Sequence, residues 1–455
     1  TKFWERLYVG LGIGLYDLLA GWGGDPLPRH KHLSRKGVSS RAPALASHVC
    51  RGAIVYSDAS VDDARYVISA ARTAAGLGSL VLTSTKVTGI VHSNGRVSGA
   101  EVKCLETGQE FEVSCGTVVN ATGVWSGDIE EYAGGNNSRV RASKGIHLLI
   151  PRNRLDLEAG LMLRTSQSVL FVIPWDQHWI VGTTDTDWNL DRAHPAASQK
   201  DIDYLLSTLN QVLSTPLSSD DVVGVYAGLR PLLTGESEQT SKLSREHAVS
   251  ISTPGLVSIS GGKYTTYRLM ASDTIDAVGI DQDLDLPASK TASVPLIGAA
   301  GYSKVRSEAE KLAGDSGLGL NVIDHLISRH GDRIGEILEL ISASPDLADP
   351  LVSNHPYLRA EVVHAVRSEA ALHLEDVLTR RTRLSVETWD RGTGPARQVA
   401  ELMAQELGWG SATIDNEVDH YLWRVESERE SNTQLDDLTA DATRLGARDV
   451  RRGIS

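Results

Sequence analysis

The sequence predicts a mixed α/β fold in three successive parts: strands alternating with helices, then antiparallel strands, then helices alone. Three changes in hydrophobic periodicity support this prediction. Residues 53–123 combine strand patterns with one helical pattern, residues 139–235 read as antiparallel strands, and helical patterns fill residues 302–428. The 455 residues are enough for two or three domains with hydrophobic cores.

The first part follows the order strand, helix, strands joined by tight turns, and a final strand. A strand at residues 53–56 precedes a helix that begins after Ser60, and an Asn-Gly pair at 94–95 marks a hairpin turn. The final strand ends in a bend of small residues at 121–123. This order is typical of the second half of a dinucleotide-binding domain of the flavoprotein type. We expect the helix to bury six apolar residues: Val61, Ala64, Val67, Ile68, Ala71 and Ala75.

The second part alternates apolar and polar residues as antiparallel strands do. Residues 169–175 and 179–183 predict a hairpin, and the apolar strand at 146–150 contains a single histidine, His147. A further strand at 222–229 is predicted to end at Arg230.

The third part predicts helices, with a charged and weakly periodic end that we expect to be a flexible tail at 431–455. The expected helices cover residues 302–313, 321–343, 359–372, 395–407 and 413–428.

The first 22 residues carry apolar side chains on one helical face. Their longest uncharged run is too short to span a bilayer, and we expect the face to lie in the core rather than at a membrane. Residues 21–46 predict an irregular surface segment. The face consists of Trp4, Leu7, Tyr8, Leu11, Leu15, Leu18 and Trp22.

Composition excludes some classes of protein. The net charge of −13 argues against sequence-independent binding of nucleic acid, which needs a basic surface. The three cysteines are odd in number and lack the spacing of metal ligands, so we expect a reducing compartment and predict no metal site.

Three cations stand at the ends of predicted elements: Arg230, Arg245 and Lys263. Burying an unpaired cation is unfavourable, so each needs an anionic partner. That partner is either a phosphorylated substrate or a nearby carboxylate such as Glu236 or Glu246.

The turn before Lys263 allows two interpretations. Two glycines at 261–262 separate a buried strand from a helix, which fits either an anion site at a helix N-terminus or an ordinary strand–turn–helix. His147 likewise fits either a core histidine or a catalytic one.

Seven motifs, in order along the chain, resemble the FAD-dependent, membrane-associated glycerol-3-phosphate dehydrogenases of bacteria. They are VYSDASVDDAR at 55–65, VNATGVW at 119–125, ASKGIHLLIP at 142–151, VIPW at 172–175, VGTTD at 181–185, YAGLRPL at 226–232 and GGKYTTY at 261–267. A weaker match is VLTRR at 377–381.

The resemblance implies an FAD-binding domain of the glutathione-reductase and D-amino-acid-oxidase type, an antiparallel substrate domain and an all-α C-terminal domain. The family begins with a strand, a G-x-G-x-x-G loop and a helix that hold the FAD pyrophosphate, and this sequence lacks them. The implied boundaries are 1–45 (part of the substrate domain), 46–135 (FAD-binding), 136–238 (substrate-binding), 239–285 (FAD-binding again), 286–430 (helical) and 431–455 (tail).

The resemblance also implies roles for individual residues. Arg230 and Arg245 would grip the substrate phosphate, and His147 would take the C2 hydroxyl proton as hydride leaves C2 for flavin N5. Lys263 would stabilise the developing negative charge, with a role as the base as the alternative. Val87 would lie near the adenine end. The residues that would line FAD are Ala121, Thr122, Gly123, Gly262, Lys263 and Thr265.

The implied reaction is oxidation of sn-glycerol 3-phosphate to dihydroxyacetone phosphate, with a quinone as electron acceptor. The family's proteins contact the inner face of the plasma membrane peripherally from the cytoplasm, and a homodimer is compatible with the resemblance. Two alternatives stay open: an oxidase that uses oxygen, and a binding protein without activity.

Overall fold

In the computed structural model, the chain consists of two compact units. The first unit contains Thr1–Asp63, Leu148–Thr183 and Ile202–Val223, and the second contains Ala64–His147, Thr184–Asp201 and Gly224–Ser455. The structure describes residues 3–20, 27–135, 140–164, 169–234, 246–447 and 450–451.

The first unit begins with helix α1 (Phe3–Ala20), and the described apolar side chains of its predicted face do not lie in a core. The side chains of Trp4, Leu7 and Trp22 lie outside the described part. Tyr8 is 73% exposed and Leu11 is 68% exposed, and Leu15 and Leu18 are exposed as well. The expectation of a buried face was therefore wrong for these residues. In the described part of the chain, no helix combines the length and the apolar character needed to cross a membrane.

The segment at 21–46, which was expected to be irregular, contains a strand and a helix. Strand β1 (Lys31–Ser34) pairs antiparallel with β2 (Gly52–Val55), and helix α2 (Arg35–Arg41) lies between them in sequence. The hydroxyl of Ser34 accepts a hydrogen bond from the Gly37 N–H and caps α2, a local signal that the composition of the segment obscured.

The remaining strands of this unit form the expected antiparallel sheet. Its order is the end of β7 (Val140–Pro151), then β10 (His178–Gly182), β9 (Val169–Trp175) and β8 (Leu161–Arg164). The core includes Trp179, whose indole N–H donates to the carbonyls of Arg152 and Leu155 at 3.2 Å each. Leu205 and Leu209 of helix α5 (Gln199–Asn210) are also fully buried.

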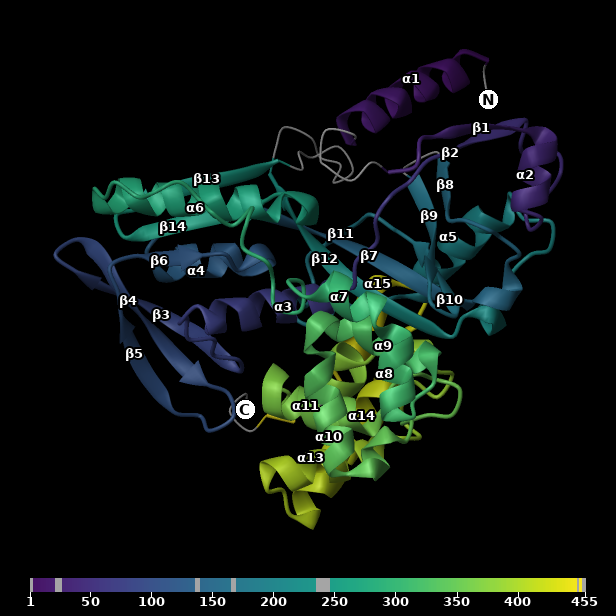
Figure 1. The fold of residues 1–455 in the computed structure, drawn as a ribbon. Coiled ribbons are helices and arrows are strands. Elements are labelled where there is room, and N and C mark those ends of the chain that lie inside the picture. The colour runs from purple at the N-terminus through teal and green to yellow at the C-terminus, as the bar shows by residue number, and fades with distance from the viewer. Residues whose placement is uncertain are drawn as a thin grey trace. The chain divides into compact units, whose positions relative to one another are not determined.

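The second unit contains a three-stranded sheet in the order β13 (His247–Thr253), β14 (Leu256–Gly261) and β6 (Val118–Asn120). Strand β6 runs parallel to β14, with Val118 opposite Leu256. Helix α6 (Tyr267–Gln282) packs along β13 and β14 (Figure 1).

The predicted strands with tight turns form a separate three-stranded sheet. It consists of β3 (Thr85–Ser93), β4 (Arg96–Cys104) and β5 (Glu110–Ser114) in sequential order. Asn94 and Gly95 both have positive φ, as the predicted hairpin turn requires.

Helix α3 (Asp63–Gly76) differs from its predicted packing. Val61, which precedes it, and Val67 are exposed, and the buried residue of the helix is Arg65. The partners of Arg65 lie more than 260 residues away in sequence, so the local apolar pattern gave no sign of them.

Two strands flank the first half of β7 in the second unit. β11 (Thr186–Trp188) pairs with it antiparallel, and β12 (Gly224–Leu233) pairs with it as well. β12 extends through Arg230 and Pro231 rather than ending there.

The C-terminal part is helical, as predicted, but two of the predicted helices are each divided into two. The segment expected at 302–313 divides into α7 (Tyr302–Ser307) and α8 (Ala309–Ser316). The segment expected at 321–343 divides at Gly331, where a Cβ atom would lie 1.9 Å from the carbonyl oxygen of Gly298. The other helices are α9 (Leu320–His330), α10 (Ile334–Ala343), α11 (Arg359–Glu369), α12 (Leu384–Glu387), α13 (Ala396–Leu407) and α14 (Ser411–Ser431).

The expected flexible tail instead contains helix α15 (Asp437–Arg444), which packs on α14. Asp436 caps it by accepting a hydrogen bond from the Thr439 N–H, and Ala440 is fully buried. Asp437 pairs at 2.6 Å with the ammonium group of Lys144, which is itself fully buried. In the described part of this segment, Asp436 thus caps a helix and Asp437 forms an ion pair.

Candidate functional site

Two glycine-containing turns share one edge of the β13–β14–β6 sheet. β6 and β14 are adjacent and parallel, so their carboxyl ends lie on the same side of the sheet, where ligands bind in α/β folds. Gly123 lies after β6 with φ of +60°. Gly261 ends β14 with φ of +73°, and Gly262 follows it with φ of +89°. The backbone at both turns adopts a conformation that side chains disfavour and that lets a ligand approach closely.

A buried polar network fixes the first of these turns. The Asn120 side chain donates to the Ser126 carbonyl at 3.0 Å and to the Ser258 hydroxyl at 3.2 Å, and it accepts from the Thr122 hydroxyl at 2.7 Å. Asn120 is almost fully buried, whereas Ala121 and Thr122 are exposed. The network therefore fixes the backbone of the bend through its buried side, while Ala121 and Thr122 stay exposed. Sequence reasoning missed Asn120, although an asparagine that closes an apolar strand was a visible signal.

The end of β12 lies beside both turns. A Cβ atom on Gly123 would be 3.9 Å from Pro231, and a Cβ atom on Gly261 would be 2.8 Å from Leu233. Arg230 precedes these two residues in β12, and its guanidinium donates a hydrogen bond to the Thr184 carbonyl at 3.1 Å. Arg230 is thus the neighbour in sequence of Pro231, the residue of β12 that lies nearest to the first turn.

His147 lies on β7 and stacks against Tyr226 of β12. The ring centroids are 5.0 Å apart and the ring planes differ by 18°, an offset-parallel arrangement. His147 is half-buried and Tyr226 is 38% exposed. Tyr226 and Arg230 occupy alternate positions of one strand and share a face. Sequence reasoning included Tyr226 in a motif but gave it no role.

Lys263 is exposed and directly follows the second turn. A short 3-10 turn at Tyr264–Thr266 comes next, and α6 begins only at Tyr267, so the helix starts later than predicted. Tyr264 and Tyr267 pack edge-on against Tyr66 of α3, with centroids 5.7 and 5.3 Å away. Burial and the hydrogen bond to Tyr267 raise the pKa of Tyr66 to about 12, so the phenol stays protonated.

The other predicted site residues are placed as follows. Thr265 is exposed in the 3-10 turn after Lys263. Val87 lies on β3 and packs against the small core around Val97 and Leu256. Arg245 lies outside the described residues. The structure thus places His147 and Arg230 on neighbouring strands, with Gly123 and Gly261 beside the end of β12 and Lys263 two residues after Gly261.

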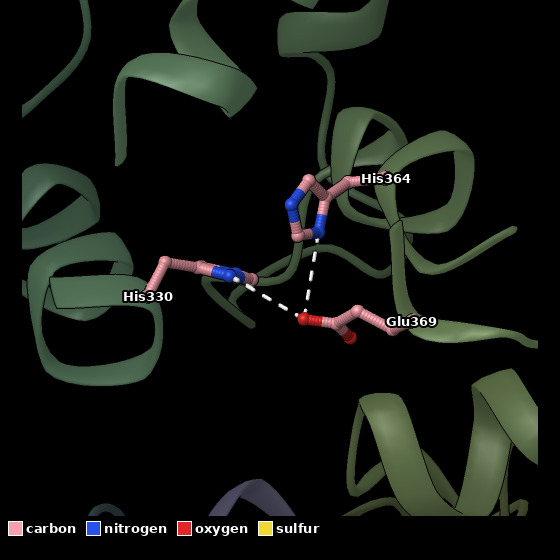
Figure 2. A group of neighbouring side chains, drawn as sticks. All are labelled: His330, His364 and Glu369. Carbon is pink, nitrogen blue, oxygen red and sulfur yellow. Dashed lines mark ion pairs between the residues drawn. The ribbon is translucent and has the colours of Figure 1, made fainter. Parts of the chain in front are cut away.

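A second polar cluster, in the helical part, has the residue types of a metal site. The Nδ1 atoms of His364 and His330 lie 3.5 and 3.9 Å from one carboxylate oxygen of Glu369 (Figure 2). The guanidinium of Arg65 also binds there, at 2.7 Å from the other oxygen of Glu369 and 3.2 Å from Nδ1 of His330.

The charges of this cluster disfavour a dication. Within ion-pair distance, the carboxylates of Glu336, Glu361 and Glu369 face the guanidinium groups of Arg65, Arg72 and Arg329. Arg333 also pairs with Glu336 at 2.8 Å, so four guanidinium groups already neutralise the three carboxylates, and a buried divalent ion would add positive charge without a partner. We therefore describe this cluster as an ion-pair network.

The pKa values follow from these contacts. Burial, assisted by the charge of Arg65 and opposed by Glu361 and Glu369, lowers the pKa of His330 to about 4, so the imidazole is neutral. Burial acts to raise the pKa of Glu369, but Arg65, His330 and His364 outweigh it and lower the pKa to about 2.

Comparisons with known proteins agree with this fold and site. Residues 12–268, more than half of the chain, match the family described as FAD dependent oxidoreductase. Residues 289–414 match the C-terminal domain of alpha-glycerophosphate oxidase. The class of protein is thus an FAD-dependent oxidoreductase, in agreement with the prediction. The open glycine turns at the carboxyl ends of β6 and β14 are suited to that cofactor.

Similar proteins show to which family of FAD-dependent oxidoreductases the chain belongs. The chain is 47% identical over 454 residues to glycerol-3-phosphate dehydrogenase 2 of Mycobacterium tuberculosis, covering all of this chain and 77% of the relative. It is 34% identical to the mitochondrial glycerol-3-phosphate dehydrogenase of Homo sapiens, covering 90% of this chain and 58% of the relative. The chain belongs to the glycerol-3-phosphate dehydrogenase family of FAD-dependent oxidoreductases, as its motifs predicted.

A solved structure supports the fold assignment. The glycerol-3-phosphate dehydrogenase from Bacillus halodurans, complexed with FAD, matches with a TM-score of 0.76 and 26% sequence identity. The match covers 90% of this chain and 80% of that chain. The predicted mixed α/β fold with antiparallel sheets and a helical C-terminal part is therefore confirmed.

Proposed function

We propose that this protein oxidises sn-glycerol 3-phosphate to dihydroxyacetone phosphate and passes the electrons to a membrane quinone. One observation carries the proposal: β12 presents Arg230 and the Tyr226–His147 stack on a strand that borders both glycine turns. The strand thereby combines a phosphate-binding group, a candidate base and a neighbouring place for a flavin. The names of the relatives support the choice of substrate.

The reaction removes a hydride from C2 and a proton from the C2 hydroxyl. FAD, when bound, supplies the two-electron acceptor for that hydride. His147 takes the hydroxyl proton, and the ring of Tyr226 fixes the plane of the imidazole. Lys263, at the second glycine turn, stabilises the negative charge that develops as the proton leaves, with a role as the base as the alternative.

Two groups bind the substrate phosphate in this proposal. The planar guanidinium of Arg230 offers paired N–H donors to phosphate oxygens, which gives both charge and orientation. Arg245 would supply the second guanidinium from a segment outside the described residues.

The cofactor-lining residues follow from the same placement. The open bend would hold FAD through Ala121, Thr122 and Gly123, because the Asn120 network fixes its backbone from behind. Gly262, Lys263 and Thr265 would line the flavin from the second turn, and Val87 would lie near the adenine end.

The electron acceptor has two candidates. The match of residues 289–414 to a domain of alpha-glycerophosphate oxidase favours oxygen as the second candidate. A quinone acceptor fits a protein that contacts the inner face of the plasma membrane peripherally from the cytoplasm, alone or as a homodimer.

An anaerobic titration tests the substrate assignment. FAD-loaded protein mixed with sn-glycerol 3-phosphate should lose flavin absorbance, whereas glycerol should leave it unchanged. Reoxidation by a soluble quinone without peroxide would support the dehydrogenase, and stoichiometric peroxide in air would favour the oxidase. A flavin that stays oxidised with the substrate would refute both.

A further inference from the structure

One face of β12 is covered at its start and open farther along the strand. Residues 224, 226, 228 and 230 point to the same side because side chains alternate along a strand. A Cβ atom on Gly224 would lie 2.2 Å from the carbonyl oxygen of Val386, so helix α12 covers the start of this face. The ring of Tyr226 comes next, stacked on His147.

Gly228 differs sharply from Gly224. It is exposed, and a Cβ atom on it would have no heavy atom of the described residues within 4 Å. Its φ lies outside the positive region, so its backbone does not require glycine. Neither packing nor backbone conformation among the described residues explains a glycine at this position.

The open space at Gly228 lies between Tyr226, which stacks on the proposed base His147, and Arg230, the proposed phosphate-binding residue. Tyr226 and Arg230 are each two residues away on the same face, about 7 Å along the strand at roughly 3.3 Å per residue. A ligand with its phosphate on Arg230 and its reacting hydroxyl at His147 must cross the surface of Gly228.

We infer that Gly228 is a specificity-determining residue, whose missing side chain leaves room for the carbon chain of a small phosphate monoester. The inference rests on the proposed function and adds the surface that limits substrate size. A methyl group at this position would occupy the space of the carbon chain, and an isopropyl group would fill it.

This role predicts opposite effects on stability and activity. Glycine inside a strand loses more conformational freedom on folding than alanine does, so Gly228→Ala should keep or raise the melting temperature. The same change should raise KM for sn-glycerol 3-phosphate, because the added methyl group competes with substrate and not with protein atoms.

The test compares full-length, FAD-loaded wild type with Gly228→Ala and Gly228→Val. KM should rise at least fivefold for alanine and kcat/KM should fall at least a hundredfold for valine, with flavin content retained. Gly335→Ala is the matched control, because a Cβ atom there, on helix α10, also has no described heavy atom within 4 Å. Its kinetics should equal those of wild type.

The outcomes separate two kinds of failure. If wild-type flavin stays oxidised with the substrate, the proposed function fails and this inference fails with it. If wild-type flavin is reduced and Gly228→Ala keeps KM within twofold of wild type, the inference alone is overturned. The alanine variant decides the matter even if valine reduces the yield of folded protein.

Discussion

Arg65, His330 and Glu369 make their ion pairs with side chains at most 9% exposed, whereas Tyr226 on β12 is 38% exposed and Gly228 beside it is open. Both groups of residues belong to the same compact unit. The buried group has strongly shifted pKa values and its carboxylate is paired with a guanidinium, which are the marks of a structural ion-pair network. The β12 face has an open surface next to glycine turns, which is the mark of a binding site. Perturbed pKa values alone would therefore have pointed to the ion-pair network and not to the site that we propose on β12.

The largest effect on activity is expected at His147. His147→Asn should lower kcat by roughly 10²–10⁴-fold, the usual contribution of a positioned general base. Single-turnover flavin reduction measures this loss directly. His420→Asn, on helix α14, is the control and should leave kcat unchanged. A loss smaller than threefold in His147→Asn would make Lys263 the better candidate for the base.

The buried network should respond in stability instead. Glu369→Gln removes the carboxylate that Arg65 contacts at 2.7 Å and leaves a buried guanidinium without its charge partner. We expect a loss of about 3–5 kcal/mol in the free energy of unfolding, measured with urea.

A matched control sharpens this prediction. Glu406 pairs with the exposed Arg367, and Glu406→Gln should lose no more than about 1 kcal/mol. Under conditions where Glu369→Gln remains folded, its kcat/KM should stay close to wild type. Equal losses of stability in the two variants would contradict the contrast between buried and exposed pairs.

Arg230 should affect substrate binding rather than the chemical step. Arg230→Ala should raise KM for sn-glycerol 3-phosphate at least tenfold, about 1.4 kcal/mol for a lost charge-assisted contact. Arg230→Lys should give an intermediate KM, because it keeps the charge and loses the paired donors. An unchanged KM in the alanine variant would remove Arg230 from the site.

The smallest effect is a pH dependence of stability that comes from His330. Its pKa of about 4 in the folded protein lies below the ordinary value of 6.5, so the unfolded chain binds a proton that the folded chain does not. Stability should therefore fall as pH decreases from 6.5 toward 4, while the contribution is fully present above 6.5.

The measurement compares wild type with His330→Gln. Between pH 7 and 5.5, wild type should lose about 1 kcal/mol more than the variant, given one pKa unit per 1.4 kcal/mol. Parallel pH profiles for the two proteins would show that His330 is not held neutral by burial.

The sequence predicted what depends on neighbours along the chain. The turn at Asn94-Gly95 and the final bend at Gly123 follow from local conformational preferences, and both have the expected positive φ. The resemblance to a known family then predicted His147 and Arg230, which the structure places on neighbouring strands.

What the sequence could not predict depends on distant partners. The burial of Arg65 could not be predicted from the apolar helical pattern around it, because its partner Glu369 is 304 residues away. Helix α15 looked like a charged tail because Lys144, the partner of Asp437, lies 293 residues earlier. The roles that we propose for Tyr226 and Gly228 depend on the pairing of β12 with β7, which local sequence patterns do not show.

The most direct measurement is a crystal structure of the FAD-loaded protein with dihydroxyacetone phosphate bound. The β12 face should hold this ligand with its phosphate within hydrogen-bonding distance of Arg230, its carbon chain against Gly228 and its C2 oxygen toward His147. A ligand whose phosphate lies away from Arg230, or whose carbon chain avoids Gly228, would contradict the assignment of this face as the substrate site.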